Sequence, residues 1–361
     1  MRGSFIREQA LALAQRGHDV HVVFADPAAR RWPLTVHRTS DGPLTQHAIA
    51  APWPLHRLLG FYWPQSLVWS LRRLVLEVRP DVIHAHAARP AAVLATQAAA
   101  RCGVPVLMTE HKSNLRTFWL TSHGWRQLRN AYERCERLFA VSNGLKDTLE
   151  TAFPSTRGRW TVNYNAIDME MFRIDAARRR SLPETQRRIL FLGGLTARKG
   201  LPTLLDALAR LPPQFALTVA GPGASPQRVF ALARAVGVQT RVSAVGLVDR
   251  PSVAALLNEH HVLAVPSYQE TFGLVCAEAL ACGTPVVATR CGGPEEIVTP
   301  DLGMIVEPRD SAALAAAIEL VVGSGWKWQP DRARAYVEER FSMAALALRL
   351  ERHYESVAHR A

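Results

Sequence analysis

The chain has 361 residues and 48% of them are hydrophobic, which is more than one hydrophobic core usually organises. Two domains are therefore expected. Lys and Arg number 43 against 31 Asp and Glu. The excess lies in residues 1–160, with 21 basic and 11 acidic side chains, whereas residues 161–361 hold 22 and 20. No nucleic-acid-binding motif accompanies this charge, so we expect no nucleic-acid partner.

Cysteine usage and hydropathy indicate a cytoplasmic protein. The cysteines include no Cys-x-x-Cys pair and are odd in number, which favours free thiols in a reducing compartment. No apolar run reaches the roughly 18 residues of a membrane span, and the first residues lack the apolar core of a signal peptide. The five cysteines are Cys102, Cys135, Cys276, Cys282 and Cys291.

Aromatic residues accompany the basic charge of the first half. This combination favours contact with an anionic membrane surface, where each nearby cation gains about 1 kcal/mol and tryptophan lies well at the interface. A solvated basic face with the aromatic residues packed inside is the alternative. The residues are Trp32, Trp53, Phe61, Tyr62, Trp63, Trp69, Phe118, Trp119 and Trp125, with Arg57, Arg72, Arg73 and Arg116.

Short apolar runs of strand length alternate with helical patterns through both halves of the chain. Such alternation predicts parallel sheets covered by helices on both faces. In the first half, we expect helices at residues 10–14, 67–78, 91–100 and 131–137, and strands at 20–24, 82–85, 105–109 and 138–141. In the second half, we expect strands at 189–192, 216–220, 242–245 and 262–265, and helices at 204–211, 227–236, 312–322 and 343–357.

The stretch 267–289, SYQETFGLVCAEALACGTPVVAT, places two carboxylates around a predicted helix start. Glu270 precedes Thr271, the predicted N-cap, and Glu278 lies within the helix before Gly283 ends it. The helix is expected to open with Phe272, Gly273 and Leu274.

This arrangement suits a nucleotide-sugar. Unpaired amides at a helix start, with the positive end of the helix dipole, hold a diphosphate without a metal ion. Strands on either side put both glutamates at the carboxyl edge of a parallel sheet, where open α/β folds bind ligands. The helix rises about 12 Å over eight residues, so Glu270 can contact a sugar while Glu278 accepts ribose hydroxyls. Two exposed helix charges are the alternative.

The same stretch resembles the donor-site signature of the retaining, family-4 type glycosyltransferases of the GT-B fold. The Glu-x7-Glu pair, the Phe-Gly between and the Gly-x-Pro-Val-Val beyond all fall in register. The resemblance implies an α/β fold of two doubly wound, Rossmann-like domains that face a cleft. It places an acceptor-binding domain in residues 1–165, a linker in 166–187 and a nucleotide-sugar-binding domain in 188–342. A C-terminal helix, residues 343–358, is expected to cross back to the first domain.

A second match to the family lies at the start of the nucleotide-sugar-binding domain. Residues 193–195 and 198–200 resemble the family's first loop there, in which a lysine holds the donor diphosphate. Lys199 takes that role by position, since its ammonium stabilises the charge of the departing diphosphate. The family often has arginine where this chain has Gly194, and Arg198 is expected to compensate. We expect no cofactor and no metal ion, because nothing resembles an Asp-x-Asp metal signature.

Two stretches of the first half, PDVIHAH at residues 80–86 and TEH at 109–111, resemble the family's histidine-bearing strand ends. His111 is expected at the carboxyl edge of its sheet, where it hydrogen-bonds the transferred sugar. We expect His84 and His86 to alternate across their strand, so that at most one of them faces the cleft. Gly3 lies in a stretch that resembles the family's glycine loop, near the donor phosphates. The opening strand that precedes this loop in the family is missing here, which predicts unpaired neighbouring strands.

The resemblance implies a metal-independent enzyme that transfers a sugar from a nucleoside diphosphate to an acceptor hydroxyl with retention. The acceptor is expected to be a saccharide or lipid-linked group in cell-envelope polysaccharide or glycolipid synthesis, in the cytoplasm or at the inner face of the membrane. A catalytically impaired binding module and a sugar-nucleotide epimerase remain open, as do uridine and guanosine donors. The catalytic residues are His111, Lys199 and Glu270, and the donor-binding residues are Gly3, Arg198, Lys199, Phe272, Gly273, Leu274 and Glu278.

Overall fold

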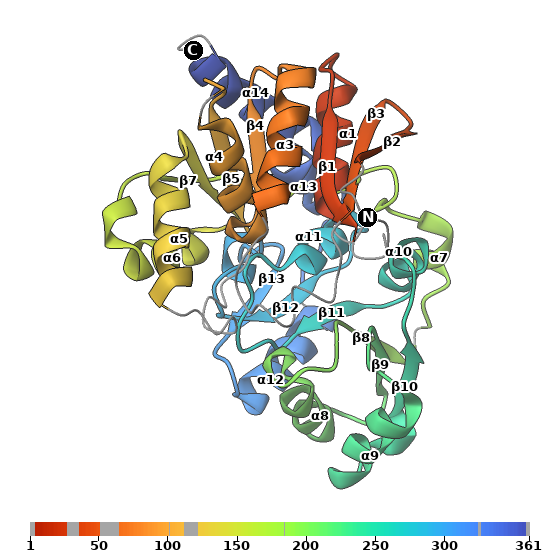
Figure 1. Cartoon of the computed structure of the whole chain (residues 1–361). Coiled ribbons are helices and arrows are strands. Elements are labelled where there is room, and N and C mark those ends of the chain that lie inside the picture. The colour runs from red at the N-terminus through yellow and green to blue at the C-terminus, as the bar shows by residue number, and fades with distance from the viewer. Residues whose placement is uncertain are drawn as a thin grey trace. The chain divides into compact units, whose positions relative to one another are not determined.

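The structure is a computed structural model that describes residues 4–26, 36–50, 65–100, 102–111, 122–183, 185–323 and 326–358. The chain divides into two compact units (Figure 1). Unit 1 comprises Met1–Ala166 together with Met343–Ala361, and unit 2 comprises Ile167–Ser342. The C-terminal segment therefore belongs to the same unit as the N-terminal half, as the sequence predicted.

Unit 1 contains two separate sheets among its described residues. The four-stranded sheet has the order β4-β5-β6-β7, and all of its strands are parallel. Its strands are β4 (Ile83–His86), β5 (Val106–Glu110), β6 (Arg137–Ala140) and β7 (Trp160–Val162). Every residue of β5 is buried, as expected for a central strand covered on both faces.

The second sheet of unit 1 has the order β1-β3-β2. Strand β1 (His21–Asp26) runs parallel to β3 (Leu44–Ala50), which forms an antiparallel hairpin with β2 (Val36–Asp41). The sequence analysis did not predict β2 and β3. Gly42, with a φ of 59°, occupies the turn between them, and β2 reads VHRTSD with mostly exposed side chains. An exposed, polar strand lacks the apolar alternation that identifies strands in a sequence.

Helices cover the sheets of unit 1. They are α1 (Ser4–Ala14), α3 (Gln65–Val78), α4 (Val93–Ala99), α5 (Ser122–Arg134), α6 (Asn143–Ala152) and α14 (Met343–Ala358), with short helical turns η1 (Ala88–Ala92) and η2 (Pro154–Thr156). The start of α6 is fixed by Ser142, whose hydroxyl accepts a hydrogen bond from the Leu145 amide at 3.0 Å.

Helix α14 packs into the core of unit 1 (Figure 1). Leu346 and Leu350 are buried in one cluster with Leu107 of β5 and Phe139 of β6. At the rim of this contact, Glu351 accepts hydrogen bonds from Arg16 at 2.5 Å and His18 at 3.0 Å. Burial of apolar side chains therefore holds the C-terminal helix on the N-terminal half.

Unit 2 is built on one six-stranded parallel sheet of order β10-β9-β8-β11-β12-β13. The chain starts at the centre with β8, builds outward through β9 and β10, and returns to the other side of β8 with β11. The strands are β8 (Arg187–Leu192), β9 (Phe215–Ala220), β10 (Val242–Gly246), β11 (Val262–Val265), β12 (Val286–Thr289) and β13 (Gly303–Val306).

The helices of unit 2 follow these strands and confirm the doubly wound α/β architecture. They are α7 (Ala176–Arg180), α8 (Leu201–Arg210), α9 (Pro226–Ala235), α10 (Arg250–Asn258), α11 (Leu274–Ala281), α12 (Ser311–Val322) and α13 (Pro330–Phe341), with turns η3 (Ala197–Lys199), η4 (Gln239–Arg241) and η5 (Pro294–Glu296). Ser225, Asp249 and Asp310 cap α9, α10 and α12 through their side-chain oxygens. Among the described residues, no helix is both long and apolar enough to span a bilayer.

The core position of α14 can be tested with two leucines of the same helix. Leu350 is fully buried, whereas Leu348 is 44% exposed. We expect Leu350→Ala to lower the free energy of unfolding by about 2–5 kcal/mol, since it leaves a cavity. Leu348→Ala should change it by about 0.5 kcal/mol or less. Urea unfolding followed by circular dichroism measures both, and equal losses would contradict the packing of α14.

Candidate functional site

The sheet of unit 2 reverses its strand order between β8 and β11. In open α/β sheets, ligands bind outside the carboxyl ends of the strands at such a reversal. The segments that leave these two strands are residues 193–200 and 266–273. They contain most of the residues that the sequence predicted to bind a donor, and these two loops therefore form the candidate site.

The two loops contact each other through backbone. The Tyr268 amide donates a hydrogen bond to the Arg198 carbonyl at 2.7 Å. Gly200 has a φ of 68°, and a Cβ at this position would lie 1.9 Å from the carbonyl oxygen of Pro266. Only glycine permits both the left-handed conformation and this close approach.

This contact brings Lys199 to Glu270. The Lys199 ammonium donates to Glu270 Oε1 in an ion pair, and the Ser267 hydroxyl donates to the same oxygen at 2.8 Å. The side chains of Lys199 and Glu270 are 19% and 11% exposed, so the charges are largely removed from water. The Lys199 chain lies over Gly193, where a Cβ would be 3.5 Å from it. The interpretation of Glu270 as an exposed helix charge is therefore wrong.

The helix start differs from the prediction. Helix α11 begins at Leu274, and its N-cap is Gly273, with a φ of 86° and no side-chain cap. Thr271 is therefore not the N-cap. Glycine takes this position because the chain enters the helix through a left-handed residue. The first-turn amides of Leu274 and its neighbour thus have no capping side chain, and they lie beside Glu270 in sequence.

Phe272 has a packing role. It is 3% exposed, and its ring lies 5.8 Å from that of Phe341 in an edge-to-face arrangement. A Cβ at Gly293 would lie 2.5 Å from the Phe272 carbonyl, so the loop after β12 closes over this residue. The Glu270 amide also donates to the Cys291 carbonyl of that loop at 3.1 Å. Phe272 therefore fixes the path of the backbone between Glu270 and α11.

Glu278 lies inside the protein, although it was expected to reach a ribose. It is 4% exposed, and its Oε1 accepts a hydrogen bond from Arg250 Nη1 at 3.1 Å. Arg250 begins α10, directly after the loop that leaves β10. The sequence analysis did not single out Arg250, although its position beyond a predicted strand end was a usable signal.

Unit 1 places three histidines together at the ends of β4 and β5. His84 and His86 stack with ring centroids 4.7 Å apart, and His86 stacks on His111 at 5.3 Å. The two rings lie on the same side of β4, so the prediction that His84 and His86 alternate across the strand is wrong. Residues two apart on a strand point to the same face.

Polar side chains connect this histidine stack. His86 Nδ1 lies 3.0 Å from His111 Nε2, and the Gln9 amide nitrogen lies 3.3 Å from His86 Nε2. His84 contacts the Tyr354 hydroxyl at 2.7 Å. Burial lowers the pKa of His86 to about 4, and burial with the neighbouring histidines holds the pKa of His84 well below its usual value. Both rings are therefore neutral near pH 7.

The backbone around His111 is anchored by the buried carboxylate of Glu110. This carboxylate accepts hydrogen bonds from the His111 amide at 2.9 Å, the Ala88 amide at 3.0 Å and the Tyr132 hydroxyl at 3.3 Å. Burial, followed by the charge of Glu110, raises the pKa of Tyr132 well above its usual value. Tyr132 therefore stays protonated and acts as a donor.

Other expected features lie outside the two loops of unit 2 and the histidine stack of unit 1. Gly3 lies outside the described residues, so its predicted phosphate contact stays a prediction. In the parts of the chain that the structure describes, no group of three or more His, Cys, Asp or Glu is arranged to hold a metal ion. All five cysteines are free, as predicted.

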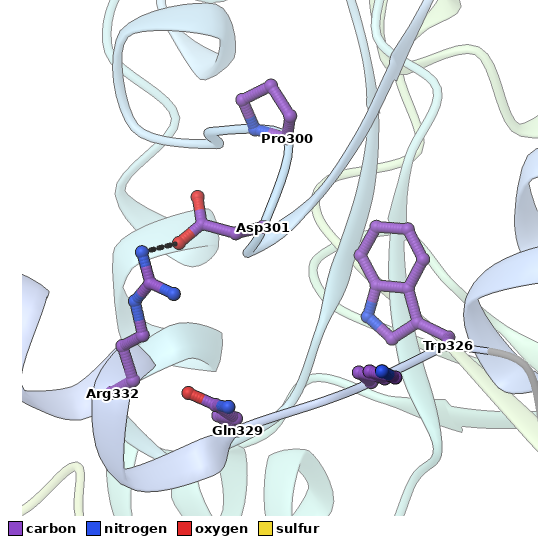
Figure 2. A pocket seen from close by; sticks show the side chains of 6 residues that line it. Pro300, Asp301, Trp326, Gln329 and Arg332 are labelled. Carbon is purple, nitrogen blue, oxygen red and sulfur yellow. Dashed lines mark ion pairs between the residues drawn. The ribbon is translucent and has the colours of Figure 1, made fainter.

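A surface hollow elsewhere in unit 2 holds none of the predicted residues (Figure 2). An ion pair between Arg332 Nη2 and Asp301 Oδ2, 2.8 Å long, lies along one side. These two groups satisfy each other, so the hollow offers no free pair of charges for a diphosphate. Its lining consists of Pro300, Asp301, Trp326, Lys327, Gln329 and Arg332.

The contact between the two loops can be tested by comparing two glycines. Gly200 and Gly237 both have positive φ values, 68° and 74°, but a Cβ at Gly237 meets nothing within 4 Å. Gly237→Ala should cost only the left-handed penalty of about 1–2 kcal/mol. Gly200→Ala should lower the melting temperature further, because its methyl group displaces the Pro266 carbonyl. Equal shifts in thermal unfolding would show that the loops are not held at this point.

Comparison with known families agrees with the geometry of both units. Residues 3–171 match the family described as Glycosyltransferase Family 4, and residues 173–339 match Glycosyl transferases group 1. The glycogen synthase of Mycobacterium tuberculosis is 31% identical over 349 residues, covering 89% of this chain and 82% of that protein. The D-inositol 3-phosphate glycosyltransferase of Mycolicibacterium paratuberculosis is 29% identical over 319 residues, covering 80% and 69%.

Solved structures show the same fold. Sucrose-phosphate synthase from Thermosynechococcus elongatus superposes with a TM-score of 0.80 at 23% identity, covering 99% of this chain and 94% of that one. Anabaena HepE in complex with UDP superposes with a TM-score of 0.74 at 20% identity, covering 86% of each chain. Both family matches and the identity to the glycogen synthase show that the chain belongs to the family-4 glycosyltransferases of the GT-B fold.

Proposed function

We propose that this glycosyltransferase moves a hexose-like sugar from a nucleoside diphosphate to an acceptor hydroxyl, with retention of the anomeric configuration and without a metal ion. The observation that carries the proposal is the Lys199–Glu270 ion pair at the strand reversal of unit 2. The helix start at Leu274 lies on the same loop as Glu270, and the cation Lys199 comes from the neighbouring loop that leaves β8.

The donor site uses these groups in different ways. The Lys199 ammonium and the first amides of α11 supply positive charge for a diphosphate, and Arg198 adds a second cation on the same loop. Glu270 accepts hydrogen bonds from sugar hydroxyls, and Glu278 accepts those of the ribose. HepE, a protein of the same fold, has been solved with UDP and with UDP-glucose. This supports a nucleotide-sugar as the donor here.

Catalysis is proposed to depend on charge stabilisation of the leaving group. As the bond to the sugar breaks, negative charge develops on the diphosphate, and Lys199 opposes it. The diphosphate in turn takes the proton of the acceptor hydroxyl, so no protein carboxylate acts as a base. His111 of unit 1 is proposed to hydrogen-bond the transferred sugar, and its neighbour His86, whose pKa burial lowers to about 4, is neutral near pH 7.

Unit 1 is proposed to bind the acceptor, and the process is proposed to be the synthesis of cell-envelope polysaccharide or glycolipid in the cytoplasm. Two alternatives predict different products. An impaired binding module binds the donor but releases no nucleoside diphosphate, and an epimerase changes the donor sugar without any acceptor. Product analysis therefore separates the three functions.

The donor proposal can be tested with uridine and guanosine diphosphate sugars. We expect one of them to raise the melting temperature in the presence of EDTA, because a ligand of the folded state stabilises it. Glu278→Gln should weaken donor binding at least several-fold, since charge-assisted hydrogen bonds contribute about 1.5–3 kcal/mol. Lys199→Ala should mainly lower turnover.

Three outcomes would contradict parts of this proposal. Activity lost in EDTA and restored by manganese would exclude the metal-independent reaction. Inversion at the anomeric carbon, detected by proton NMR, would exclude retention. Unchanged donor binding by Glu278→Gln would leave this carboxylate with a structural role only.

Unit 1 is also proposed to dock on an anionic membrane, because α3 exposes apolar and basic side chains together. Trp69 and Leu76 are 61% and 56% exposed, and they lie seven residues apart on one face of the helix. The Arg73 guanidinium lies over the Trp69 ring at 6.0 Å, and Arg72 lies on the next turn of the same face. Tryptophan and arginine with this arrangement suit the headgroup region of a bilayer.

The docking face predicts a salt-sensitive interaction. The double variant Trp69→Ser, Leu76→Ser should lose most of its sedimentation with phosphatidylglycerol vesicles. Leu320→Ser, which removes a 51% exposed leucine of α12 in unit 2, should keep it. Binding should also fall as salt rises, since screening shortens the Debye length to about 3 Å at 1 M. Equal binding to neutral and anionic vesicles would argue against electrostatic docking.

A further inference from the structure

The Arg250 side chain contacts both the Phe172 ring and the buried carboxylate of Glu278. Its guanidinium carbon lies 5.0 Å from the centroid of the Phe172 ring, and its Nη1 donates to Glu278 Oε1 at 3.1 Å. Arg250 is 29% exposed at its side chain, whereas that of Glu278 is only 5% exposed. The arginine therefore links the protein interior with the surface where β10 ends.

Phe172 is itself rigidly held. It is fully buried, and its amide donates to the Asp168 carbonyl at 2.9 Å. Its carbonyl accepts from Arg334 Nη1 at 2.8 Å, and the same guanidinium donates to the Met169 carbonyl at 2.9 Å. The ring under Arg250 is thus fixed by backbone contacts, and the planar guanidinium can stack on it without further ordering.

The helix cap before Arg250 fixes its backbone. Asp249 is the N-cap of α10, and its Oδ1 accepts from the Ser252 amide at 2.9 Å. Pro251 follows, so the first turn has a preset φ. Both the backbone and the side chain of Arg250 are therefore in place before any ligand arrives.

The chemistry of a buried carboxylate explains why the fixed position of Arg250 matters for Glu278. Removal from water disfavours the charged form of a carboxyl group, and an adjacent cation restores it. Only the ionised form accepts hydrogen bonds at all of its lone pairs, whereas a protonated carboxyl donates at one oxygen. A carboxylate that accepts two ribose hydroxyls must be both ionised and correctly oriented.

We propose that Arg250 is a positioning residue that holds Glu278 ionised and oriented for the ribose hydroxyls of the donor. This inference rests on the proposed role of Glu278 and adds the group through which that role is maintained. Arg250 acts on the nucleotide through Glu278, so it governs how strongly the enzyme distinguishes a ribonucleotide from its 2′-deoxy analogue.

The test compares binding of UDP and GDP with that of their 2′-deoxy forms, by calorimetry on the full chain. We expect Arg250→Gln to weaken binding of the preferred ribonucleotide about fivefold or more and to weaken binding of the 2′-deoxy form less, because that form has lost one of the two hydroxyls that Glu278 accepts. Arg250→Lys should recover part of the loss, because it restores the charge without the planar stack. Arg234→Ala, which removes an exposed cation of α9, is the control for net charge and should bind as the wild type does.

A double-mutant cycle with Glu278→Gln separates this role from a general structural one. If Arg250 acts through Glu278, Arg250→Gln adds little to the loss already caused by Glu278→Gln, and it raises the KM for the donor more than it lowers kcat. Additive losses, or an unchanged preference for ribose in Arg250→Gln, would overturn the inference. A wild-type protein that binds neither nucleotide would instead overturn the donor proposal, and the inference with it.

Discussion

The close approach of the Gly200 backbone to the Pro266 carbonyl is the constraint on which the proposed donor site depends. It joins the loops that leave the two strands flanking the reversal of the sheet, and the Arg198–Tyr268 hydrogen bond continues the contact. Because the loops meet through backbone, the Lys199 and Glu270 side chains are brought together without a long, flexible connection. A buried ion pair must offset the loss of hydration of both charges, and fixed loops reduce the entropy lost when it forms.

The regular elements of unit 2 were largely predictable from sequence. Strands β11 and β12 are fully buried, and the apolar residues of β8 and β9 are mostly buried, a pattern that sequence hydrophobicity identifies well. The hairpin of β2 and β3 was missed because the side chains of β2 face solvent. The cap of α11 was assigned to Thr271 because threonine is a common N-cap, but the close packing of Phe272 requires a left-handed residue, which Gly273 supplies.

Individual site residues were predictable where a sequence motif fixes them, and contacts between distant residues were not. The pairing of Lys199 with Glu270 joins residues 71 positions apart, and that of Arg250 with Glu278 joins residues 28 apart. Neither pairing follows from local spacing. The stacked histidines were predicted wrongly, although the two-residue period of a strand puts His84 and His86 on one face.

The two glutamates of the motif have different partners, and this difference suits their proposed tasks. In the proposed donor complex, the diphosphate would compete with Glu270 for the Lys199 ammonium, and Glu270 would then accept sugar hydroxyls. The guanidinium of Arg250 lies over the buried Phe172 ring as well as donating to Glu278, so this pair has a second contact that holds it in place. In this proposal, the Lys199–Glu270 pair is exchanged on donor binding while the Arg250–Glu278 pair is kept.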